Sequence, residues 1–161
     1  MADVSQVEEE NNIRKWIESL SIPQPKTGVP ICPFAKKALM EKKVMIKSAQ
    51  TPIIKHIKRE CEYLIQEDMD VIVLYLNHKV PEPILEQIIH DLQPYAEAMD
   101  CALMYDHTDN DGLCNGVQMS YGKNSLIFIQ RLSRLKQAQE WLRDKSNWYD
   151  VYSDPDDDRF Y

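Results

Sequence analysis

The sequence predicts an α/β protein in which helices pack on a mixed sheet of about four strands, in a thioredoxin-like or a ferredoxin-like arrangement, with one further helix at the N-terminus. Three observations support this class. Short apolar runs alternate with amphipathic segments of helical period along the chain. The first two connections between expected strands are helical, and such crossovers place strands in parallel. The length, 161 residues, is that of a single domain.

The first part of the chain is expected to be mainly helical. Ser5 and Glu8 have the spacing of a capping box, and apolar residues then recur at helical intervals, which predicts a helix over residues 5–20. Residues 22–30 contain three prolines and one glycine, which indicates an irregular connector. A short amphipathic run then predicts a second helix over residues 34–42.

The middle of the chain alternates between strands and helices. Residues 44–48 predict a strand, and a helix follows from Thr51, with Pro52 at its first position. Residues 70–76 form a nearly unbroken apolar run rich in β-branched residues, which is typical of a central strand buried on both faces. The apolar stripe expected to face the core from the helix at Thr51 consists of Ile54, Ile57, Cys61, Leu64 and Ile65.

The C-terminal half continues this alternation. Pro81 and Pro83 open a helix that packs inward through Ile84 and its apolar neighbours, and Pro94 is expected to break or kink it. The elements expected after it are a strand (101–106), a long loop rich in Asp, Asn and Gly (107–124), a strand (125–130) and a helix (134–145) that presents Leu135, Ala138, Trp141 and Leu142 on one side.

Composition excludes several classes of protein. Hydrophobic residues make up 43% and charged residues 28% of the chain, which rules out a largely disordered chain, a collagen-like repeat and a membrane-embedded protein. No apolar run approaches the roughly 20 residues that a membrane-spanning helix requires. The net charge of -7 repels nucleic acid and anionic membranes. We therefore expect neither nucleic acid nor a membrane as a partner.

The cysteines and the N-terminus favour a cytoplasmic protein. The chain passes from Met1 directly into the acidic stretch 3–10, without the basic and then apolar pattern of a secretion signal. The cysteines form no CxxC pair, and in a reducing compartment each is expected to be a free thiol. They are Cys32, Cys61, Cys101 and Cys114.

Cys32 is the first candidate for a functional residue. If it occupies the N-cap of its helix, with Pro33 at the first helical position, unpaired backbone N–H groups would stabilise a thiolate there. Lys36 and Lys37 would add positive charge one turn later, and together these features would lower the pKa of the thiol. The alternative is a buried cysteine that packs beside Phe34.

This segment resembles the active-site segment of glutaredoxins, in which Cys-Pro-Phe/Tyr-Cys opens a helix that continues with Lys, Ala and Leu. The resemblance implies that Cys32 is a nucleophilic thiol, although Ala35 replaces the second cysteine and excludes dithiol chemistry at this position. The chain is also similar to an uncharacterised bacterial family in which a helix with a Trp, here Trp16, precedes Cys-Pro-Phe-Ala and alternating strands and helices. The residues that match the glutaredoxin pattern are Cys32, Pro33, Phe34, Lys36, Ala38 and Leu39.

The loop after the strand at 101–106 holds several side chains capable of binding a metal ion. It lacks the bidentate Glu of an EF-hand and the spacing of a zinc site. Asp, Asn and Gly also form ordinary turns, so a plain turn is the alternative. If the loop folds over Cys32, His107 could act as its base, with help from Asp106. The metal-capable residues are Asp106, His107, Asp109, Asp111 and Cys114.

The last residues combine acidic and aromatic side chains. We expect a single α/β domain over residues 1–147 and an acidic aromatic tail over residues 148–161. The aromatic residues would dock either onto this domain or onto a protein partner.

These features lead to three hypotheses about function. The first is thiol redox or nucleophilic chemistry at Cys32, assisted by His107 or Asp106 and directed at a small-molecule or protein thiol or disulfide. It predicts that Cys32 reacts with iodoacetamide faster than the other cysteines. The second is a non-catalytic binding or accessory module that captures a protein through its tail. The third is a metal-binding protein that uses residues 106–114. The sequence identifies no cofactor and leaves open whether the protein is an enzyme.

Overall fold

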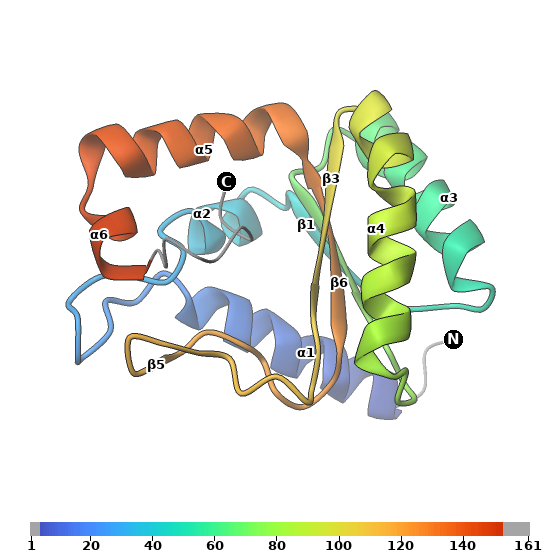
Figure 1. Cartoon of the computed structure of the whole chain (residues 1–161), viewed down its shortest axis with the longest axis horizontal. Helices are drawn as coiled ribbons and strands as arrows, with labels where there is room; N and C mark the ends of the chain where they lie inside the picture. The colour runs from blue at the N-terminus through green and yellow to red at the C-terminus, as the bar shows by residue number, and fades with distance from the viewer. Residues whose placement is uncertain (1–3, 153–161) are drawn as a thin grey trace.

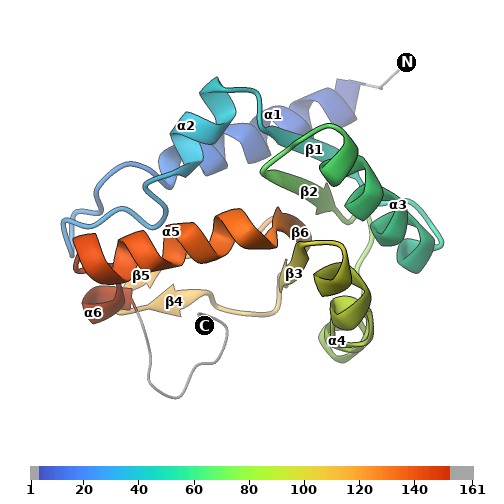
Figure 2. The ribbon, with the colours of Figure 1, turned by 90° about the horizontal axis from the view of Figure 1, so that it is seen from above.

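The structure is a computed structural model, and it describes residues 4–152. The helices are α1 (Val4–Ser19), α2 (Ala35–Met40), α3 (Ile53–Gln66), α4 (Glu82–Ala98), α5 (Leu132–Lys145) and α6 (Trp148–Tyr152). The strands are β1 (Val44–Ser48), β2 (Val71–Tyr75), β3 (Cys101–Asp106), β4 (Leu113–Cys114), β5 (Val117–Gln118) and β6 (Leu126–Arg131). Helices α1 and α2 cover one face of the main sheet, and α3 and α4 cover the other (Figure 1, Figure 2).

The main sheet has four strands in the order β1-β2-β6-β3. Strand β1 pairs with β2 in parallel, whereas β6 is antiparallel to both of its neighbours, β2 and β3. Helix α3 connects β1 to β2, and α4 connects β2 to β3 across the intervening β6. The predicted mixed sheet with packed helices and an N-terminal helix is therefore confirmed, and the structure supplies the strand order that periodicity left open.

Strand β2 is the centre of both hydrophobic layers. Its side chains alternate between the two faces, as expected for a strand covered on both sides. Ile72 and Leu74 pack with α3 and α4, while Val73 and Tyr75 pack with α1 and α2. All four are at most 1% exposed. The predicted central strand is thus confirmed.

Helix α4 continues through Pro94, so of the break or kink expected there, a break does not occur. Proline cannot donate the hydrogen bond that the carbonyl of His90 would accept in a regular helix. Both residues are exposed, which leaves that carbonyl accessible to water. Tyr95 and Ala96 then pack against the core and hold the last turn in place. Packing therefore outweighs the loss of one helical hydrogen bond.

The apolar stripes of the two crossover helices are offset from the predicted ones. Ile54 and Ile84 were both expected to face the core, but they are 46% and 53% exposed. In α3 the inward position is taken instead by the preceding residue, Ile53, whereas in α4 the other residue expected at that point, Leu85, does pack inward. Each stripe contains consecutive apolar residues, so periodicity alone did not determine which of them turns inward.

The loop expected over residues 107–124 contains a small hairpin. Strands β4 and β5 pair in antiparallel fashion, and Asn115 and Gly116 form the two-residue turn between them. Their φ angles are 51° and 75°, the left-handed values that a tight hairpin turn requires and that Asn-Gly readily adopts. The hairpin packs against the C-terminal segment through Cys114 and Val117.

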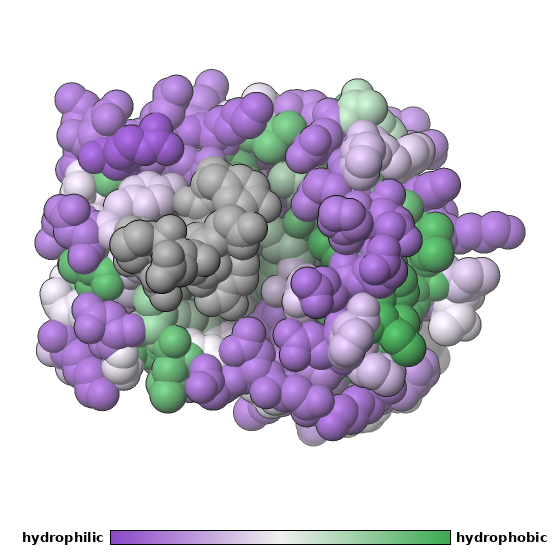
Figure 3. Space-filling model, viewed as in Figure 1, coloured by the Kyte–Doolittle hydropathy of each residue, from purple (hydrophilic) through white to green (hydrophobic). Residues whose placement is uncertain are grey.

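The residues after α5 form part of a third hydrophobic cluster. Helix α5 itself buries no residue completely, and Figure 3 shows a mainly hydrophilic surface over it. After it, Trp148 donates from Nε1 to the carbonyl of Ile31 at 2.8 Å, and the Tyr152 hydroxyl lies 2.8 Å from the Thr27 hydroxyl. The start of the expected tail is thus packed on this domain, while its acidic and last aromatic residues (153–161) lie outside the described residues. No helix within residues 4–152 has the length and apolar character needed to cross a membrane.

One edge of the main sheet is covered by a glutamine side chain. Strand β3 is an edge strand, and the amide of Gln93 on α4 pairs with both backbone groups of Leu103. The N–H of Leu103 donates to Gln93 Oε1 at 2.8 Å, and Gln93 Nε2 donates to the carbonyl of Leu103 at 3.0 Å. The side chain therefore replaces a neighbouring strand at this point.

Replacing Gln93 with alanine should lower the free energy of unfolding by about 1–3 kcal/mol, because it leaves two buried backbone groups without their partner. Urea denaturation followed by circular dichroism measures this. The matched control is Gln87→Ala on the same helix, because this exposed side chain donates a hydrogen bond to Asp91 at the surface. Equal decreases in the free energy of unfolding for the two substitutions would show that the hydrogen bonds between Gln93 and Leu103 do not stabilise the fold more than a surface contact does.

Candidate functional site

Cys32 lies before α2 and is not its N-cap. Phe34 occupies the N-cap position, so the place predicted for Cys32 in the helix is wrong. The backbone of Cys32 is instead anchored to the end of α1. Its N–H donates to the carbonyl of Leu20 at 2.8 Å, and the hydroxyl of Ser21 donates to the carbonyl of Cys32 at 2.9 Å. The same hydroxyl accepts the N–H of Lys36 at 2.9 Å and so joins the segment to α2.

Burial controls the acidity of the Cys32 thiol. The side chain packs against the cluster formed by α1, α2 and the sheet. Burial raises the pKa of the thiol, and hydrogen bonds from the N–H groups of Phe34 and Ala35 lower it by less. The net direction is opposite to the one expected from the sequence. Lys37 does not reverse it, because this exposed side chain pairs with Glu41 at 3.9 Å.

His107 and Asp106 are held by contacts of their own. His107 is 1% exposed, and its Nε2 contacts the carbonyl of Val80 while its Nδ1 accepts the N–H of Asp109 at 3.0 Å. This pattern places the ring proton on Nε2, so both ring nitrogens are engaged. Asp106 accepts the N–H of Tyr121 at 2.9 Å. The two side chains therefore fix the end of β3, and none of these contacts involves the thiol at position 32.

The loop does not assemble a metal site. Within residues 4–152, no three His, Cys, Asp or Glu side chains come together in a way that could hold a metal ion. The candidate ligands take part in turns and loop contacts instead. Asp111 accepts the N–H of Leu113 at 3.1 Å, and the thiol of Cys114 donates to the carbonyl of Tyr152 at 3.0 Å. These contacts agree with the alternative of an ordinary turn.

A second buried polar group lies between β1 and α3. Glu60 pairs with Lys47 at 2.8 Å and with His56 Nε2 at 3.2 Å, and the Nδ1 of His56 accepts the N–H of Gln50 at 2.9 Å. His56 is only 3% exposed, although a histidine among the charged residues of an amphipathic helix is expected at the surface or at its boundary. Burial lowers the pKa of His56 more than Glu60 raises it. With both ring nitrogens engaged, this group is a structural connection between the edge strand and its helix.

A surface hollow lies at the carboxyl ends of strands β2 and β3, which run in the same direction. Its volume is about 160 Å³, and we call it the carboxyl-edge hollow. In open α/β sheets, ligands bind in the crevice outside the carboxyl ends of the strands. The lining residues follow β2, follow β3 or precede β6: Leu76, Asn77, His78, Lys79, Thr108, Lys123, Asn124 and Ser125.

Internal hydrogen bonds hold the polar wall of this hollow in place. Asn124 donates to the carbonyl of Leu76 at 3.0 Å, and the hydroxyl of Ser125 accepts the N–H of Thr108 at 3.2 Å. Asn77 donates to the hydroxyl of Ser48 at the end of β1. The ends of three strands are therefore tied together around the hollow, so its shape is preorganised.

The hollow also carries positive charge that is only partly compensated. Lys79 pairs with Asp109 at 2.9 Å and holds the pKa of that carboxyl below its usual range. Within residues 4–152, the exposed side chains of Lys123 and His78 make no hydrogen bond or ion pair. Helix α3 begins beside an adjoining, smaller hollow lined by Thr51, and its first turn contains no acidic residue. The positive end of the helix dipole thus adds to the positive potential of this edge.

Residues at this edge were not singled out from the sequence. His78 begins a loop without a recognisable motif, and Lys79 and Lys123 are far apart in the chain. The usable signal was the polar run Asn77 to Lys79 directly after the central strand, because the carboxyl end of such a strand borders the usual ligand site. Recognising Lys123 as its neighbour required the strand order, which the sequence did not reveal.

Comparison with known proteins found no relative of this chain. The chain matches no protein-family model, no curated protein and no solved structure. Two interpretations of the sequence therefore stay predictions: the resemblance of residues 32–39 to a glutaredoxin segment, and the similarity of the chain to a bacterial family.

The raised pKa of Cys32 predicts slow alkylation in the native protein. At neutral pH, iodoacetamide should modify Cys32 more slowly in the folded chain than in urea, because less thiolate is present and the sulfur is less accessible. The rate in the folded chain should continue to rise above the ordinary thiol pKa of 9.0. Peptide mapping by mass spectrometry measures the rate at each cysteine. Faster reaction of Cys32 in the native state at neutral pH would contradict the raised pKa.

We expect His107 to stabilise the folded state. His107→Ala should lower the free energy of unfolding by about 2–4 kcal/mol, because two hydrogen bonds are lost and a cavity is left at a buried position. The control is His90→Ala, since His90 is exposed on α4 and such surface changes stay within about 0.5 kcal/mol. Chemical denaturation of both variants provides the comparison, and similar values for the two would refute the structural role.

Proposed function

We propose that the protein is a binding module for a small molecule that carries a phosphate or carboxylate group, and that this group binds in the carboxyl-edge hollow. The observation that carries the proposal is the ammonium of Lys123, which has no ion-pair partner among residues 4–152 and shares one preorganised hollow with amide, hydroxyl and imidazole side chains. An oxyanion is the ligand that such donors recognise. The chain as a whole has a net charge of -7, so the positive potential of the hollow contrasts with that of the rest of the protein.

The wall of the hollow offers hydrogen-bond donors of several kinds. An ammonium group has three donors, so Lys79 keeps donors for a ligand while it pairs with Asp109. The hydroxyl of Thr108 and the imidazole of His78 can donate as well. Because hydrogen bonds already orient the two asparagines, little side-chain entropy would be lost when a ligand binds there.

Binding is favoured over catalysis by the state of the residues first considered for chemistry. The ring nitrogens of His107 are both engaged, which leaves it no lone pair for a substrate proton. Burial keeps the Cys32 thiol protonated at neutral pH. A protonated thiol is a weak nucleophile.

A second candidate function is thiol chemistry at Cys32 with a small-molecule or protein disulfide. It is favoured by the hydrogen bonds that the N–H groups of Phe34 and Ala35 direct to the sulfur. Those groups would stabilise a thiolate once a partner removed water and supplied a base. The alkylation experiment on Cys32 tests this candidate independently of the hollow.

An NMR titration with inorganic phosphate, methyl phosphate and acetate tests the binding proposal. Backbone amide signals of residues 76–79 and 123–125 should shift in a saturable manner. Lys123→Gln should weaken binding about three- to tenfold, since one charge-assisted hydrogen bond is lost. The matched control is Lys37→Gln, an exposed lysine on α2 that does not line the hollow.

The two variants separate specific binding from general attraction. Equal weakening by both substitutions would show that the anions respond only to net charge. Shifts confined to residues outside the hollow would place the ligand elsewhere. Either result would overturn the proposal.

A further inference from the structure

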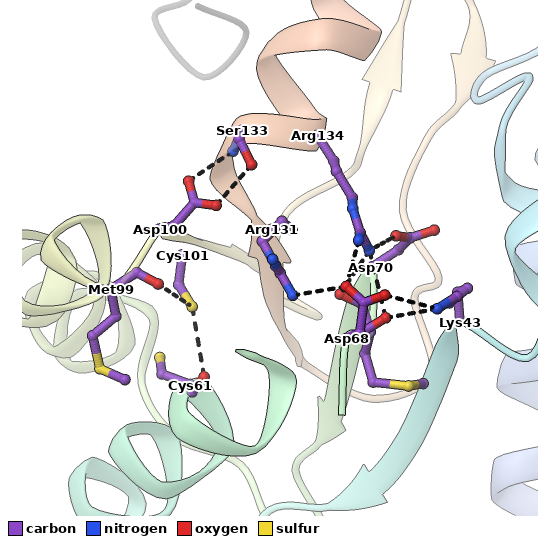
Figure 4. A network of polar contacts seen from close by, with 11 residues as sticks. Lys43, Cys61, Asp68, Asp70, Met99, Asp100, Cys101, Arg131, Ser133 and Arg134 are labelled. Carbon is purple, nitrogen blue, oxygen red and sulfur yellow. Dashed lines mark hydrogen bonds and ion pairs between the residues drawn. The ribbon is translucent and has the colours of Figure 1, made fainter. Parts of the chain in front are cut away.

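Two sulfur atoms lie close together beneath the sheet. Cys61 is on α3 and Cys101 is the first residue of β3, and both are fully buried free thiols. The Sγ of Cys101 lies 3.8 Å from the carbonyl oxygen of Cys61 and 3.7 Å from that of Met99 (Figure 4). The two cysteines are 40 residues apart in the chain but belong to one hydrophobic cluster.

An arginine faces this pair from the neighbouring strand. Arg131 is the direct partner of Cys101 in the pairing of β3 with β6. Its guanidinium donates to Asp68 at 3.2 Å, and its side chain is only 16% exposed. Among the described residues, its Nε is the one buried side-chain nitrogen or oxygen without a hydrogen-bond partner. Unsatisfied buried donors are rare in folded proteins and call for an explanation.

The surroundings make the two thiols chemically unequal. A hydrogen bond from the thiol of Cys61, and the positive charge of Arg131, lower the pKa of Cys101 despite its burial. The same hydrogen bond raises the pKa of Cys61, which is the donor. Arg131, which lies opposite Cys101 in the strand pairing, therefore makes Cys101 the more readily ionised of the two thiols.

We propose that Cys101 and Cys61 form a redox-active dithiol, in which hydrogen peroxide oxidises Cys101 and Cys61 then closes a disulfide between β3 and α3. Arg131 is a positioning residue that stabilises the thiolate of Cys101. This dithiol is separate from the carboxyl-edge hollow, because Cys101 lies at the beginning of β3 and the hollow lies beyond its end.

The chemistry balances without another reactant. The thiolate of Cys101 attacks one oxygen of hydrogen peroxide, the O–O bond breaks, and hydroxide leaves, which gives a sulfenic acid at Cys101. The sulfur of Cys61 then attacks the sulfenic sulfur, and the S–O bond breaks. Hydroxide and the two thiol protons end as water, so two thiols and one peroxide give one disulfide and two waters. Peroxide is reduced and the two sulfurs are oxidised.

Burial determines which oxidants react. Both residues are 0% exposed, so we expect hydrogen peroxide, a molecule close to the size of water, to reach the sulfurs when the structure opens locally, and bulky disulfides to be excluded. The cross-link would join helix α3 to the edge strand β3. It would constrain the unfolded chain and make the oxidised protein more resistant to urea.

The test treats the full-length protein with hydrogen peroxide and identifies the products by non-reducing peptide mapping. We expect a 61–101 disulfide, the loss of two of the four thiols, and a higher urea midpoint that dithiothreitol reverses. Dimedone should trap a sulfenic acid at Cys101 in Cys61→Ser, but none at Cys61 in Cys101→Ser. Oxidation to a sulfinic acid without a disulfide, or a disulfide through another pair, would overturn the proposal.

Arg131 is tested against a neighbouring arginine in the same polar network. Arg131→Met should slow peroxide consumption about tenfold, whereas Arg134→Met, which removes a guanidinium from Asp68 and Asp70, should leave the rate within twofold. Both variants are first checked for native circular dichroism and for the urea midpoint of the reduced state. Equal rates of peroxide consumption in the two variants would show that Arg131 does not promote oxidation of Cys101. If both rates instead change in proportion to the urea midpoint, oxidation occurs in the unfolded protein, which would also contradict the proposal.

Discussion

The burial of strand β2 on both faces is the constraint on which the rest of the structure depends. Full burial of each large apolar side chain contributes about 1.5–3 kcal/mol, and consecutive residues of β2 contribute to opposite layers. A shift of register by one residue would exchange the two sets, so Ile72 must face α3 and α4 while Val73 faces α1 and α2. Both ends of β2 are thereby placed: Asp70 is paired with Arg134 before the strand, and Asn77 lines the hollow after it.

The sequence predicted the elements whose pattern is local and strong. An uninterrupted β-branched run identified β2, and a single apolar stripe identified α1. The failures occurred where tertiary packing outweighed a local rule, as in the passage of α4 through Pro94. The hairpin in the loop was different, because Asn115-Gly116 between short apolar pairs is a local signal that was present in the sequence and was overlooked.

The candidate sites were less accessible to sequence reasoning for a physical reason. The acidity of Cys32 depends on how completely its neighbours bury it, and a motif of a few residues does not encode that burial. Cys61 and Cys101 are adjacent only because α3 packs across the beginning of β3. Lys123 joins Lys79 only because β6 is inserted between β2 and β3. Each site thus depends on the strand order.

The two ends of the sheet differ in how their cations are balanced. At the end where β2 begins, Arg131 and Arg134 are paired with Asp68, and Lys43 pairs with the same carboxylate at 3.3 Å (Figure 4). At the other end, Lys123 has no carboxylate partner in the described chain. Charges on a protein surface are screened over about 8 Å at physiological ionic strength, so the distant acidic residues that make the whole chain negative do not cancel this ammonium. The proposed anion site would therefore respond to the local arrangement of charge at this end of the sheet, even though the whole chain is acidic.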